Sequence, residues 1–499
     1  MDISALKSGT DLRGVGSGEG ITLTDEAVFA AVSAFAVFLK EKTGKAGMLK
    51  VALGHDSRVS GERICAAAES ALKAADCEIY AAGLCSTPSM FMMTKFEETD
   101  CDGSIMVTAS HHPANRNGLK FFTKSGGIDS SDLDSIIAYA AENKTIEGKE
   151  SRVLRKDYMK LYKDFLLRRA RELSGEEFPL TGMKICIDAG GGAGGFFADV
   201  LSALGADTSS SQFLEPDGTF SNHIPNPENE TAMSALSERV KATGSDLGVI
   251  FDADVDRAAI AAADGSEINR NRLIALVSAV LLSERKGGTI VTDSVTSDGL
   301  KEFITSHGGV HRRFKRGYRN VINEAQRLES AGIDVPLAIE TSGHAALKEN
   351  YFLDDGAYLS LRLVIAAARL RSEGKSLTDL ISELKQPVES KEIRLGIKGK
   401  DFHITAKEVL RQLESVAGEL EKNNMCTLAK DSCEGVRVNM NLGDGFFLAR
   451  CSVHDPVMVV NIESNIEGGV RKIAGFLAAF FCSYSALECT DLKNVAENG

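Results

Sequence analysis

The sequence lacks an apolar run long enough to cross a membrane. The longest one, Ala27 to Leu39, has 13 residues between charged neighbours, whereas a spanning helix needs about 20. We expect a buried helix there. The polar start Met1-Asp2 has neither the basic region nor the apolar region of a secretory signal, which favours a cytoplasmic protein with no membrane partner.

The sequence also lacks paired cysteines and an excess of positive charge. Its 10 cysteines are scattered, with neither a C-x-x-C pair nor a Cys/His cluster at zinc spacing, which indicates reduced thiols. A net charge of −13 argues against a nucleic-acid partner, although a local group of arginines could still hold a phosphorylated substrate. No low-complexity segment is present, so we expect the whole chain to fold.

Hydrophobic spacing predicts helices and strands in alternation. A helix is expected over Ala27 to Leu39, with Thr24 as its N-cap, and another over Arg63 to Ala75. Strands are expected at Lys50 to Leu53, Glu78 to Ala81, Gly103 to Val107, Met183 to Asp188, Asp246 to Phe251, Thr289 to Thr292 and Val335 to Ile339. This order is typical of βα units with a mainly parallel sheet.

The pattern changes from about Val388. A helix is expected over Lys407 to Lys422, followed by strand character between Val436 and Val460. Since 499 residues exceed one hydrophobic core, we predict an α/β protein with three successive mixed or mainly parallel βα domains and a smaller C-terminal α+β domain. The predicted domain ranges are 1–155, 156–266, 267–386 and 387–499.

A serine motif, Thr108-Ala109-Ser110-His111-His112-Pro113, follows the strand that ends at Val107. The carboxyl end of a parallel strand is where α/β sheets place reactive groups. A serine hydroxyl needs a base or a nearby cation to act as a nucleophile, and His111, His112 and Lys120 offer both. The same hexapeptide also fits a helix cap followed by a proline turn.

An acidic motif, Asp252-Ala253-Asp254-Val255-Asp256-Arg257, follows a second apolar strand. Its three carboxylates could converge on one hard cation, which prefers oxygen ligands. An EF-hand is disfavoured, because Arg257 and Ala263 stand where its glycine and glutamate belong. Solvated acids on a loop are the other interpretation.

Three further segments are open to two interpretations each. Glu340-Thr341-Ser342-Gly343-His344 could hold sugar hydroxyls or form a simple turn. Arg450-Cys451-Ser452-Val453-His454-Asp455-Pro456 lies between two strand-like runs and could cradle a phosphate. Gly190-x-Gly192-x-x-Gly195 matches the dinucleotide fingerprint, but a tight strand-to-helix turn explains it equally simply.

The order of these motifs resembles the α-D-phosphohexomutase superfamily, the phosphoglucomutase and phosphomannomutase enzymes, over essentially the whole chain. Gly9-Thr10-Asp11-Leu12-Arg13-Gly14 is similar to the family's N-terminal signature, and Gly54-His55-Asp56-Ser57-Arg58 follows it. The serine, acidic, sugar and phosphate motifs then occur in the family's order. The resemblance implies four domains around a central cleft.

The resemblance also implies roles for individual residues. Ser110 would carry the phosphoryl group and would contribute, with Asp252, Asp254 and Asp256, to one Mg²⁺ site. Lys120 would be the general acid or base with His111 nearby, and Arg257 would be a positive clamp. The implied substrate contacts are Arg13, Lys315, Glu340, Ser342, His344, Arg450, Ser452, Val453 and His454.

The implied activity is the interconversion of hexose 6-phosphate and hexose 1-phosphate, for mannose or glucose. The phosphoserine would give its phosphate to the sugar, and a hexose 1,6-bisphosphate would reorient as intermediate and activator. The partner would be a small phosphosugar, and the chain a monomer or homodimer. Alternatives are a phosphoglucosamine mutase and, from another class, a non-catalytic sugar-phosphate sensor on the same scaffold.

Three positions depart from the family's pattern. His112 replaces the usual Asn, and Ile339 stands where Gly commonly precedes the Glu. Val453-His454-Asp455 replaces the usual Asn/Gly-Thr-Glu, while Arg450, Ser452 and Pro456 keep their places.

Overall fold

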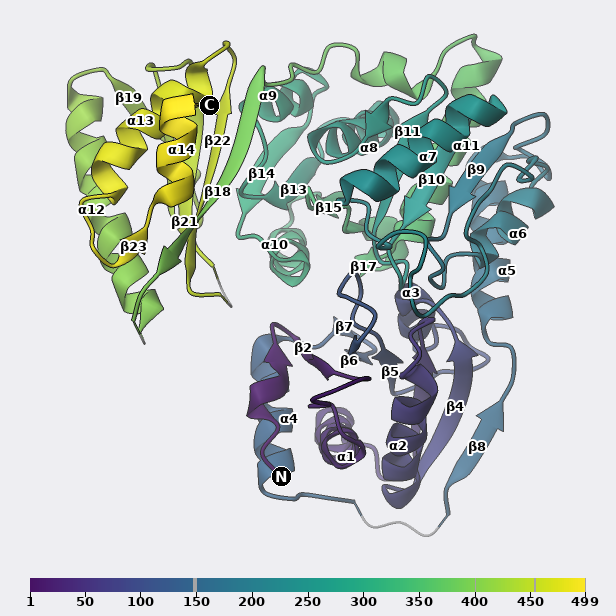
Figure 1. Ribbon diagram of the computed structural model, residues 1–499. Coiled ribbons are helices and arrows are strands. Elements are labelled where there is room, and N and C mark those ends of the chain that lie inside the picture. Colours follow the sequence, from purple (N-terminus) through teal and green to yellow (C-terminus); the bar gives the residue numbers. More distant parts are fainter. Residues whose placement is uncertain (147–149, 400, 453–454, 499) are drawn as a thin grey trace. The chain divides into compact units, whose positions relative to one another are not determined.

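The computed structural model describes residues 1–146, 150–399, 401–452 and 455–498 (Figure 1). The described residues form two compact units, each discontinuous in sequence. The first unit joins Met1–Val280 to Pro336–Ile381, and the second joins Leu281–Val335 to Ser382–Gly499. Among the described helices, none is both long and apolar enough to cross a membrane. Val453 and His454, two of the predicted substrate contacts, lie outside the described residues.

The first unit begins with an eight-stranded mixed sheet of order β1-β2-β6-β5-β3-β4-β8, in which β7 pairs with β6. Strands β5, β3, β4 and β8 are parallel, whereas β6 is antiparallel to β5 and β2 is antiparallel to β6. The bounds are β1 Lys7–Ser8, β2 Asp11–Val15, β3 Leu49–His55, β4 Cys77–Leu84, β5 Gly103–Val107, β6 Arg116–Thr123, β7 Gly126–Gly127 and β8 Arg152–Arg155.

The helices of this sheet are α1 Asp25–Thr43, α2 Gly61–Ala74, α3 Thr87–Met92 and α4 Ser130–Ala141. The predicted N-cap of α1 is confirmed, because the Thr24 side chain accepts a hydrogen bond from the backbone of Ala27. The apolar run from Ala27 to Leu39 is mostly buried, as predicted, and packs into the core of this sheet. Apolar burial of this extent is the main stabilising contribution to the unit.

A four-stranded sheet of order β12-β11-β10-β9 follows in the same unit. Its strands are β9 Ile185–Asp188, β10 Leu247–Phe251, β11 Ala258–Ala262 and β12 Glu267–Ile268. Only the pair of β9 and β10 is parallel among these described strands, so the sheet is more antiparallel than predicted. Its helices are α5 Met159–Ser174, α6 Phe196–Ala203 and α7 Glu230–Thr243.

The stretch Pro336–Ile381 completes the first unit. It contains the antiparallel strands β15 Leu337–Ile339, β16 Ala345–Leu347 and β17 Leu353–Asp354, and the helix α11 Gly356–Ser372. Two hydrogen bonds join it to the preceding sheet: Gly356 donates its N–H to the carbonyl of Val255 at 3.0 Å, and Ala258 donates to Gly343 at 3.3 Å. Arg257 and His344 form an antiparallel β-bridge.

The second unit contains two strands and two helices before its C-terminal part. Strands β13 Thr289–Asp293 and β14 Val310–Phe314 are parallel, and the helices are α9 Asp298–Ser306 and α10 Tyr318–Ser330. Helix α8, Asn271–Glu284, leads into it.

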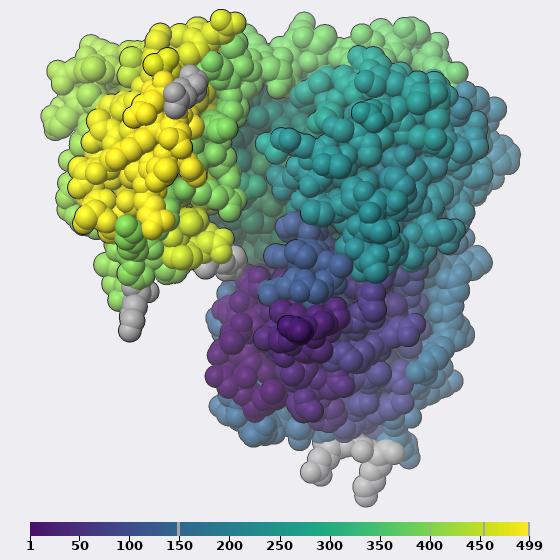
Figure 2. All heavy atoms as spheres, in the orientation of Figure 1, coloured from purple at the N-terminus to yellow at the C-terminus, as the bar shows by residue number. Residues whose placement is uncertain are grey.

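The C-terminal part is a six-stranded antiparallel sheet of order β19-β20-β21-β22-β18-β23. Its strands are β18 Glu389–Ile397, β19 Cys426–Leu428, β20 Val436–Met440, β21 Gly445–Cys451, β22 Val457–Ser464 and β23 Leu487–Glu488, and its helices α12 Phe402–Lys422, α13 Gly469–Phe481 and α14 Thr490–Asn498. Helices α13 and α14 (yellow) lie on the surface shown in Figure 2.

The predicted fold class is confirmed: the chain is α/β, with three βα parts and a smaller C-terminal α+β part. All 10 cysteines are free thiols, as predicted. The division into four domains and the central cleft stay predictions.

Candidate active site

Ser110 lies in the turn between β5 and β6 and not at the start of a helix, so the helix-cap interpretation is wrong. Its φ is +51°, a left-handed conformation that a residue with a side chain rarely adopts. The residue is buried, and its hydroxyl donates a hydrogen bond of 2.8 Å to Oδ2 of Asp252. Such local strain persists only where neighbouring groups enforce it.

Three aspartates from the loop between β10 and β11 surround this hydroxyl. Asp252, Asp254 and Asp256 are all buried, and they offer ligand atoms within 4.8 Å of one another. Burial first, and then the charges of Asp256 and Asp254, raises the pKa of Asp252 well above its ordinary value. The interpretation of solvated acids is therefore wrong for this loop.

These carboxylates fit a hard divalent cation. Oδ1 of Asp254 and Oδ1 of Asp256 are buried and accept no hydrogen bond from any described residue. A buried carboxylate oxygen without a donor is costly unless a cation satisfies it. Oxygen ligands at this spacing suit Mg²⁺ or Ca²⁺ better than a thiophilic metal.

Lys120 lies on β6 and reaches the same aspartates. Its Nζ is 2.9 Å from Oδ2 of Asp254 and also donates to Oδ2 of Asp256. Burial raises the pKa of Asp256, but the charge of Lys120, followed by those of His344 and Arg257, outweighs burial and lowers this pKa overall. The structure thus brings Lys120 and the acidic loop together.

His111 and Arg257 form the other side of the Ser110 hydroxyl. Nδ1 of His111 lies 3.3 Å from the Ser110 Oγ and accepts a hydrogen bond of 2.8 Å from Nη2 of Arg257. An Nδ1 that accepts belongs to a neutral ring. Burial, and after it the Arg257 charge, lowers the pKa of His111 far below its ordinary value, which agrees with that assignment.

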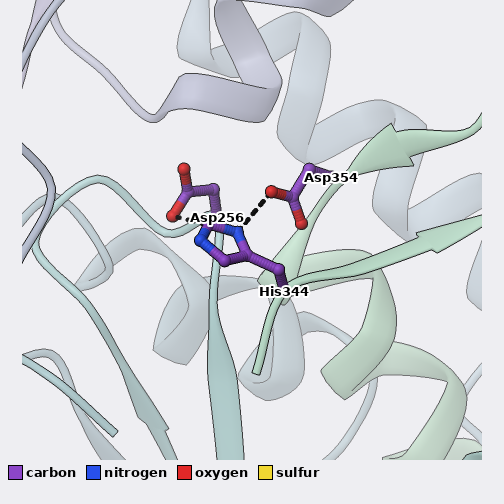
Figure 3. A group of neighbouring side chains, drawn as sticks. All are labelled: Asp256, His344 and Asp354. Atoms are coloured by element: carbon purple, nitrogen blue, oxygen red, sulfur yellow. Dashed lines mark ion pairs between the residues drawn. The ribbon is translucent and has the colours of Figure 1, made fainter. Parts of the chain in front are cut away.

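His344 directly precedes β16 and lies beside Asp256 of the acidic loop. Figure 3 shows its ring between Asp354, which forms an ion pair with Nδ1, and Asp256, whose Oδ1 lies 3.9 Å from the same nitrogen. Burial lowers the pKa of His344, but Asp354 and Asp256 together outweigh burial and the Arg257 charge, so that the pKa is raised overall. Asp256 therefore belongs to two groups of potential metal ligands, since Asp256, His344 and Asp354 also converge.

Glu340 and Ser342 lie in the turn between β15 and β16. The N–H of Glu340 donates to the carbonyl of His344 at 2.9 Å, and Gly343 has a φ of +93°. A Cβ on Gly343 would lie 2.8 Å from the carbonyl oxygen of Ala258, so the turn packs tightly on β11. The turn interpretation is confirmed, and contact with a sugar stays a prediction.

Arg13 lies on β2, opposite Gly118 of β6, and pairs with Asp11 at 2.8 Å. Its charge, after burial, lowers the pKa of His112 to about 4. Arg13 thus belongs to the same neighbourhood as the Ser110 loop.

Lys315, Arg450 and Ser452 lie in the second unit. Lys315 is exposed in the turn after β14, and Arg450 is near the end of β21. Glu434 connects the two segments: its Oε1 accepts from the N–H of Arg316 at 3.2 Å and lies 3.9 Å from Nε of Arg450. The Oγ of Ser452 accepts from the N–H of Asp455 at 3.2 Å.

The glycine motif at 190–195 forms the tight turn between β9 and α6. The N–H groups of Gly191, Gly192 and Ala193 donate to the carbonyls of Phe213, Ala189 and Ala253. A Cβ on Gly192 would lie 2.8 Å from the backbone of Ala253. Because these donors bind protein carbonyls, the loop does not present them to a pyrophosphate, and the dinucleotide interpretation is wrong.

Sequence reasoning assigned no role to several residues that contact the site. Thr87 donates to Asp254 from the start of α3, Asp354 binds His344, and Glu228 lies 3.7 Å from Arg257. In the sequence, Arg58 stands out only as the last residue of the motif Gly54-His55-Asp56-Ser57-Arg58. Among Thr87, Asp354 and Glu228, only Asp354 carries a recognisable sequence signal, the acidic pair Asp354-Asp355, since the other two reach the site through the fold alone.

Comparison with known proteins identifies the family. Three models of phosphoglucomutase/phosphomannomutase α/β/α domains match the chain: domain I at residues 6–147, domain II at 160–265 and domain III at 269–388. The chain belongs to the α-D-phosphohexomutase superfamily, within its phosphoglucomutase/phosphomannomutase family. Members of this family are mutases, a class of isomerases, and this chain is an enzyme of that class.

Two relatives cover nearly the whole chain. The phosphoglucomutase of Neisseria gonorrhoeae is 28% identical over 468 residues, which span 93% of this chain and 94% of the relative. The phosphomannomutase/phosphoglucomutase of Pseudomonas aeruginosa PAO1 is 27% identical over 465 residues, spanning 93% of this chain and 92% of the relative.

Solved structures of similar proteins have the same fold as this chain. A phosphoglucomutase/phosphomannomutase family protein from Burkholderia thailandensis has a TM-score of 0.79 at 25% identity, covering 100% of this chain and 99% of that one. Parafusin from Paramecium, at 16% identity and a TM-score of 0.71, covers 98% of this chain and 95% of that chain and shares the fold.

Proposed function

We propose that this chain interconverts the 6-phosphate and 1-phosphate of glucose or mannose through a phosphoserine at Ser110 and a hexose 1,6-bisphosphate. The observation that carries the proposal is the hydrogen bond of 2.8 Å from the buried Ser110 hydroxyl to Asp252, inside a group of three carboxylates. The four predicted ranges are proposed as the domains, with the phosphoserine in the first and the acidic loop in the second.

Ser110 would alternate between two states. In the forward step the bond between Ser110 Oγ and phosphorus breaks, and a bond forms from phosphorus to a sugar hydroxyl oxygen, which releases its proton. Lys120 is the proposed general acid or base for that proton, with His111 nearby, and His344 is a proposed substrate contact. After the bisphosphate reorients, its other phosphate returns to Ser110, so that one centre serves both ends of the sugar.

The cations around Ser110 would stabilise the charge of the transferred phosphoryl group. Lys120 binds two carboxylates as an ammonium does, and Arg257 is placed beside both Asp252 and His111. Asp252, Asp254 and Asp256 are the proposed ligands of one Mg²⁺, which when bound supplies positive charge to the phosphoryl oxygens. Without such a cation the three carboxylates would repel a phosphate.

The remaining predicted residues would bind the sugar and the phosphate that is not transferred. Glu340 and Ser342 are proposed to form hydrogen bonds with sugar hydroxyls, and Arg13 is proposed to contact the substrate. In the second unit, Lys315 is proposed to contact the substrate, and Arg450 and Ser452 to hold the second phosphate, since a guanidinium matches phosphate oxygens.

Peptide mass mapping of the purified protein tests the proposal. We expect a phosphate on Ser110, loss of that phosphate with an acceptor sugar phosphate, and no mutase activity in Ser110→Ala. Full activity of Ser110→Ala would overturn the covalent mechanism. Assays on glucose, mannose and glucosamine phosphates compare the substrates. A clear preference for the amino sugar would replace the proposed substrate, and a protein that binds sugar phosphates without turnover would be a sensor.

A further inference from the structure

Arg58 is a buried arginine next to the Ser110 loop. It follows β3, and its side chain has no exposed surface. Its Nε donates to Oδ2 of Asp56 at 3.1 Å. Its two terminal nitrogens donate to four backbone carbonyls of one loop: Pro113 at 2.6 Å, Arg116 at 3.0 Å, His112 at 2.7 Å, and Ser110.

These contacts use the full capacity of the side chain. A guanidinium has five N–H groups in a fixed plane, and Arg58 has one acceptor for each of them. No N–H group is left to bind a phosphate or a sugar. A lysine has three donors on a single nitrogen and could not reach carbonyls spread over residues 110–116 in this arrangement.

The same group of residues holds Ser110 from its other side. The N–H of Ser110 donates to Oγ1 of Thr108 at 2.9 Å, and that hydroxyl donates to Oδ2 of Asp56 at 2.7 Å. Asp56 therefore binds both Thr108 and Arg58, and these two fix the N–H and the carbonyl of Ser110. Because hydrogen bonds hold both its N–H and its carbonyl, Ser110 can keep the unfavourable φ of +51°.

The loop between α6 and α7 packs over Arg58. The ring of Phe220 lies 5.0 Å from the guanidinium carbon, a cation–π contact. Gly218 packs so closely on the Arg58 turn that a Cβ there would lie 2.3 Å from the carbonyl oxygen of Ser57. Water is thereby kept from the hydrogen bonds of the guanidinium, which strengthens them.

We propose that Arg58 is a positioning residue, whose guanidinium holds the Ser110 loop in the conformation that directs Oγ of Ser110 at Asp252. The inference rests on the proposed role of Ser110 as the phosphorylated nucleophile. Arg58 touches neither phosphate nor sugar, so it acts on the rate of phosphoryl transfer and not on substrate binding. A misplacement of about 1 Å in a reacting group costs about 100-fold in rate.

The test compares Arg58→Lys and Arg58→Ala with Arg239→Ala. Arg239 is a matched control, because its Nε donates to the carbonyl of Ser210 at 2.8 Å, away from the site. We expect kcat of Arg58→Lys to fall by about 100-fold and KM by less than about threefold in either direction. Guanidinium ion at millimolar concentration should raise the activity of Arg58→Ala by about tenfold, and leave wild type and Arg239→Ala unchanged.

The outcomes separate this inference from the proposed function. A wild-type protein without phosphate on Ser110 would contradict the proposed function itself. A phosphorylated wild type, together with unchanged kcat in Arg58→Lys, would overturn the positioning role, and so would a change in KM alone or an Arg58→Ala without rescue. If neither Arg58 variant folds, Phe220→Leu decides: we expect kcat to fall about threefold at unchanged KM, and no fall would overturn the inference.

Discussion

The hydroxyl of Thr87 donates a hydrogen bond of 2.5 Å to Oδ2 of Asp254, although the two residues are 167 positions apart. The N–H of Thr87 also donates to the carbonyl of Asp254, at 2.8 Å. The start of α3 therefore fixes both the backbone and the carboxylate of the central aspartate. Oδ2 is directed at Thr87 and Lys120, which leaves Oδ1 for a cation.

Thr87→Val should weaken Mg²⁺ binding. Valine keeps the shape of threonine but removes the donor that orients Asp254, and loss of such an outer contact lowers metal affinity by about 10- to 100-fold. Titration calorimetry with Mg²⁺ measures the effect. Thr94→Val is the control, since that hydroxyl donates to the carbonyl of Phe91 and should leave the affinity unchanged. Equal Kd values for wild type and Thr87→Val would contradict the prediction.

Glu463→Gln should change how stability depends on pH. Burial raises the pKa of Glu463 on β22 to about 7, from an ordinary value of 4.5, against the charge of Arg437. Between these values the folded state holds more protons than the unfolded state, so the free energy of unfolding falls as pH rises through 7. Compared with its value at low pH, the free energy of unfolding above pH 7 is lower by at most on the order of 3 kcal/mol.

Glutamine does not ionise, so the Glu463→Gln variant does not lose this stability as the pH rises. We expect Glu463→Gln and wild type to have similar Tm values at pH 5, and the variant to have the higher Tm at pH 8.5. Glu408→Gln is the control, because Glu408 is in an exposed ion pair with Arg411 that lowers its pKa to about 2, outside the range tested. Parallel Tm curves for Glu463→Gln and wild type would be evidence against the predicted titration.

Tyr162→Phe should destabilise the first unit. The Tyr162 hydroxyl of α5 donates at 2.6 Å to Asp355, the N-cap of α11, and both residues are buried. Loss of this donor leaves a buried carboxylate oxygen less satisfied, which costs about 1–3 kcal/mol. Denaturant unfolding measures the change. Tyr139→Phe removes a surface hydroxyl that binds Glu41 and should cost less than about 0.5 kcal/mol. Equal losses in both variants would show that the hydrogen bond to Asp355 is unimportant.

Glu434→Gln should weaken the binding of hexose phosphate. Glu434 accepts from the N–H of Arg316 and faces Nε of Arg450, so its charge orients two segments proposed to contact the substrate. We expect KM to rise about fivefold with kcat nearly unchanged, as for an interaction made equally in the ground and transition states. Glu419→Gln, which removes an exposed ion pair with Lys422, is the control. A fall in kcat at constant KM would rule out this role.

The pattern of apolar residues in the sequence predicted the strands whose two faces are both buried. Strand β5 runs over Gly103–Val107, as predicted, and all five of its residues are buried. Local pattern did not predict strand direction: β6 and β11 are antiparallel to their neighbours because of how the chain turns after Ser110 and after Asp256, and no apolar spacing records that.

The candidate site was predictable where its residues are neighbours in sequence. Asp252, Asp254 and Asp256 form one group because a single loop carries them. The roles of Arg58 and Thr87 could not be predicted, since each depends on a loop brought near by the fold. An arginine in a turn has the same sequence signal whether it contacts solvent or four carbonyls.

The discontinuity of the first unit has a consequence for synthesis on the ribosome. Arg257 emerges well before His344, its partner in the β-bridge, and Val255 before Gly356, whose N–H it binds. A nascent chain that ends before Pro336 contains Ser110 and the acidic loop but not the segment that completes their unit. The enzyme therefore assembles its candidate site late, only after residues 336–381 have left the exit tunnel.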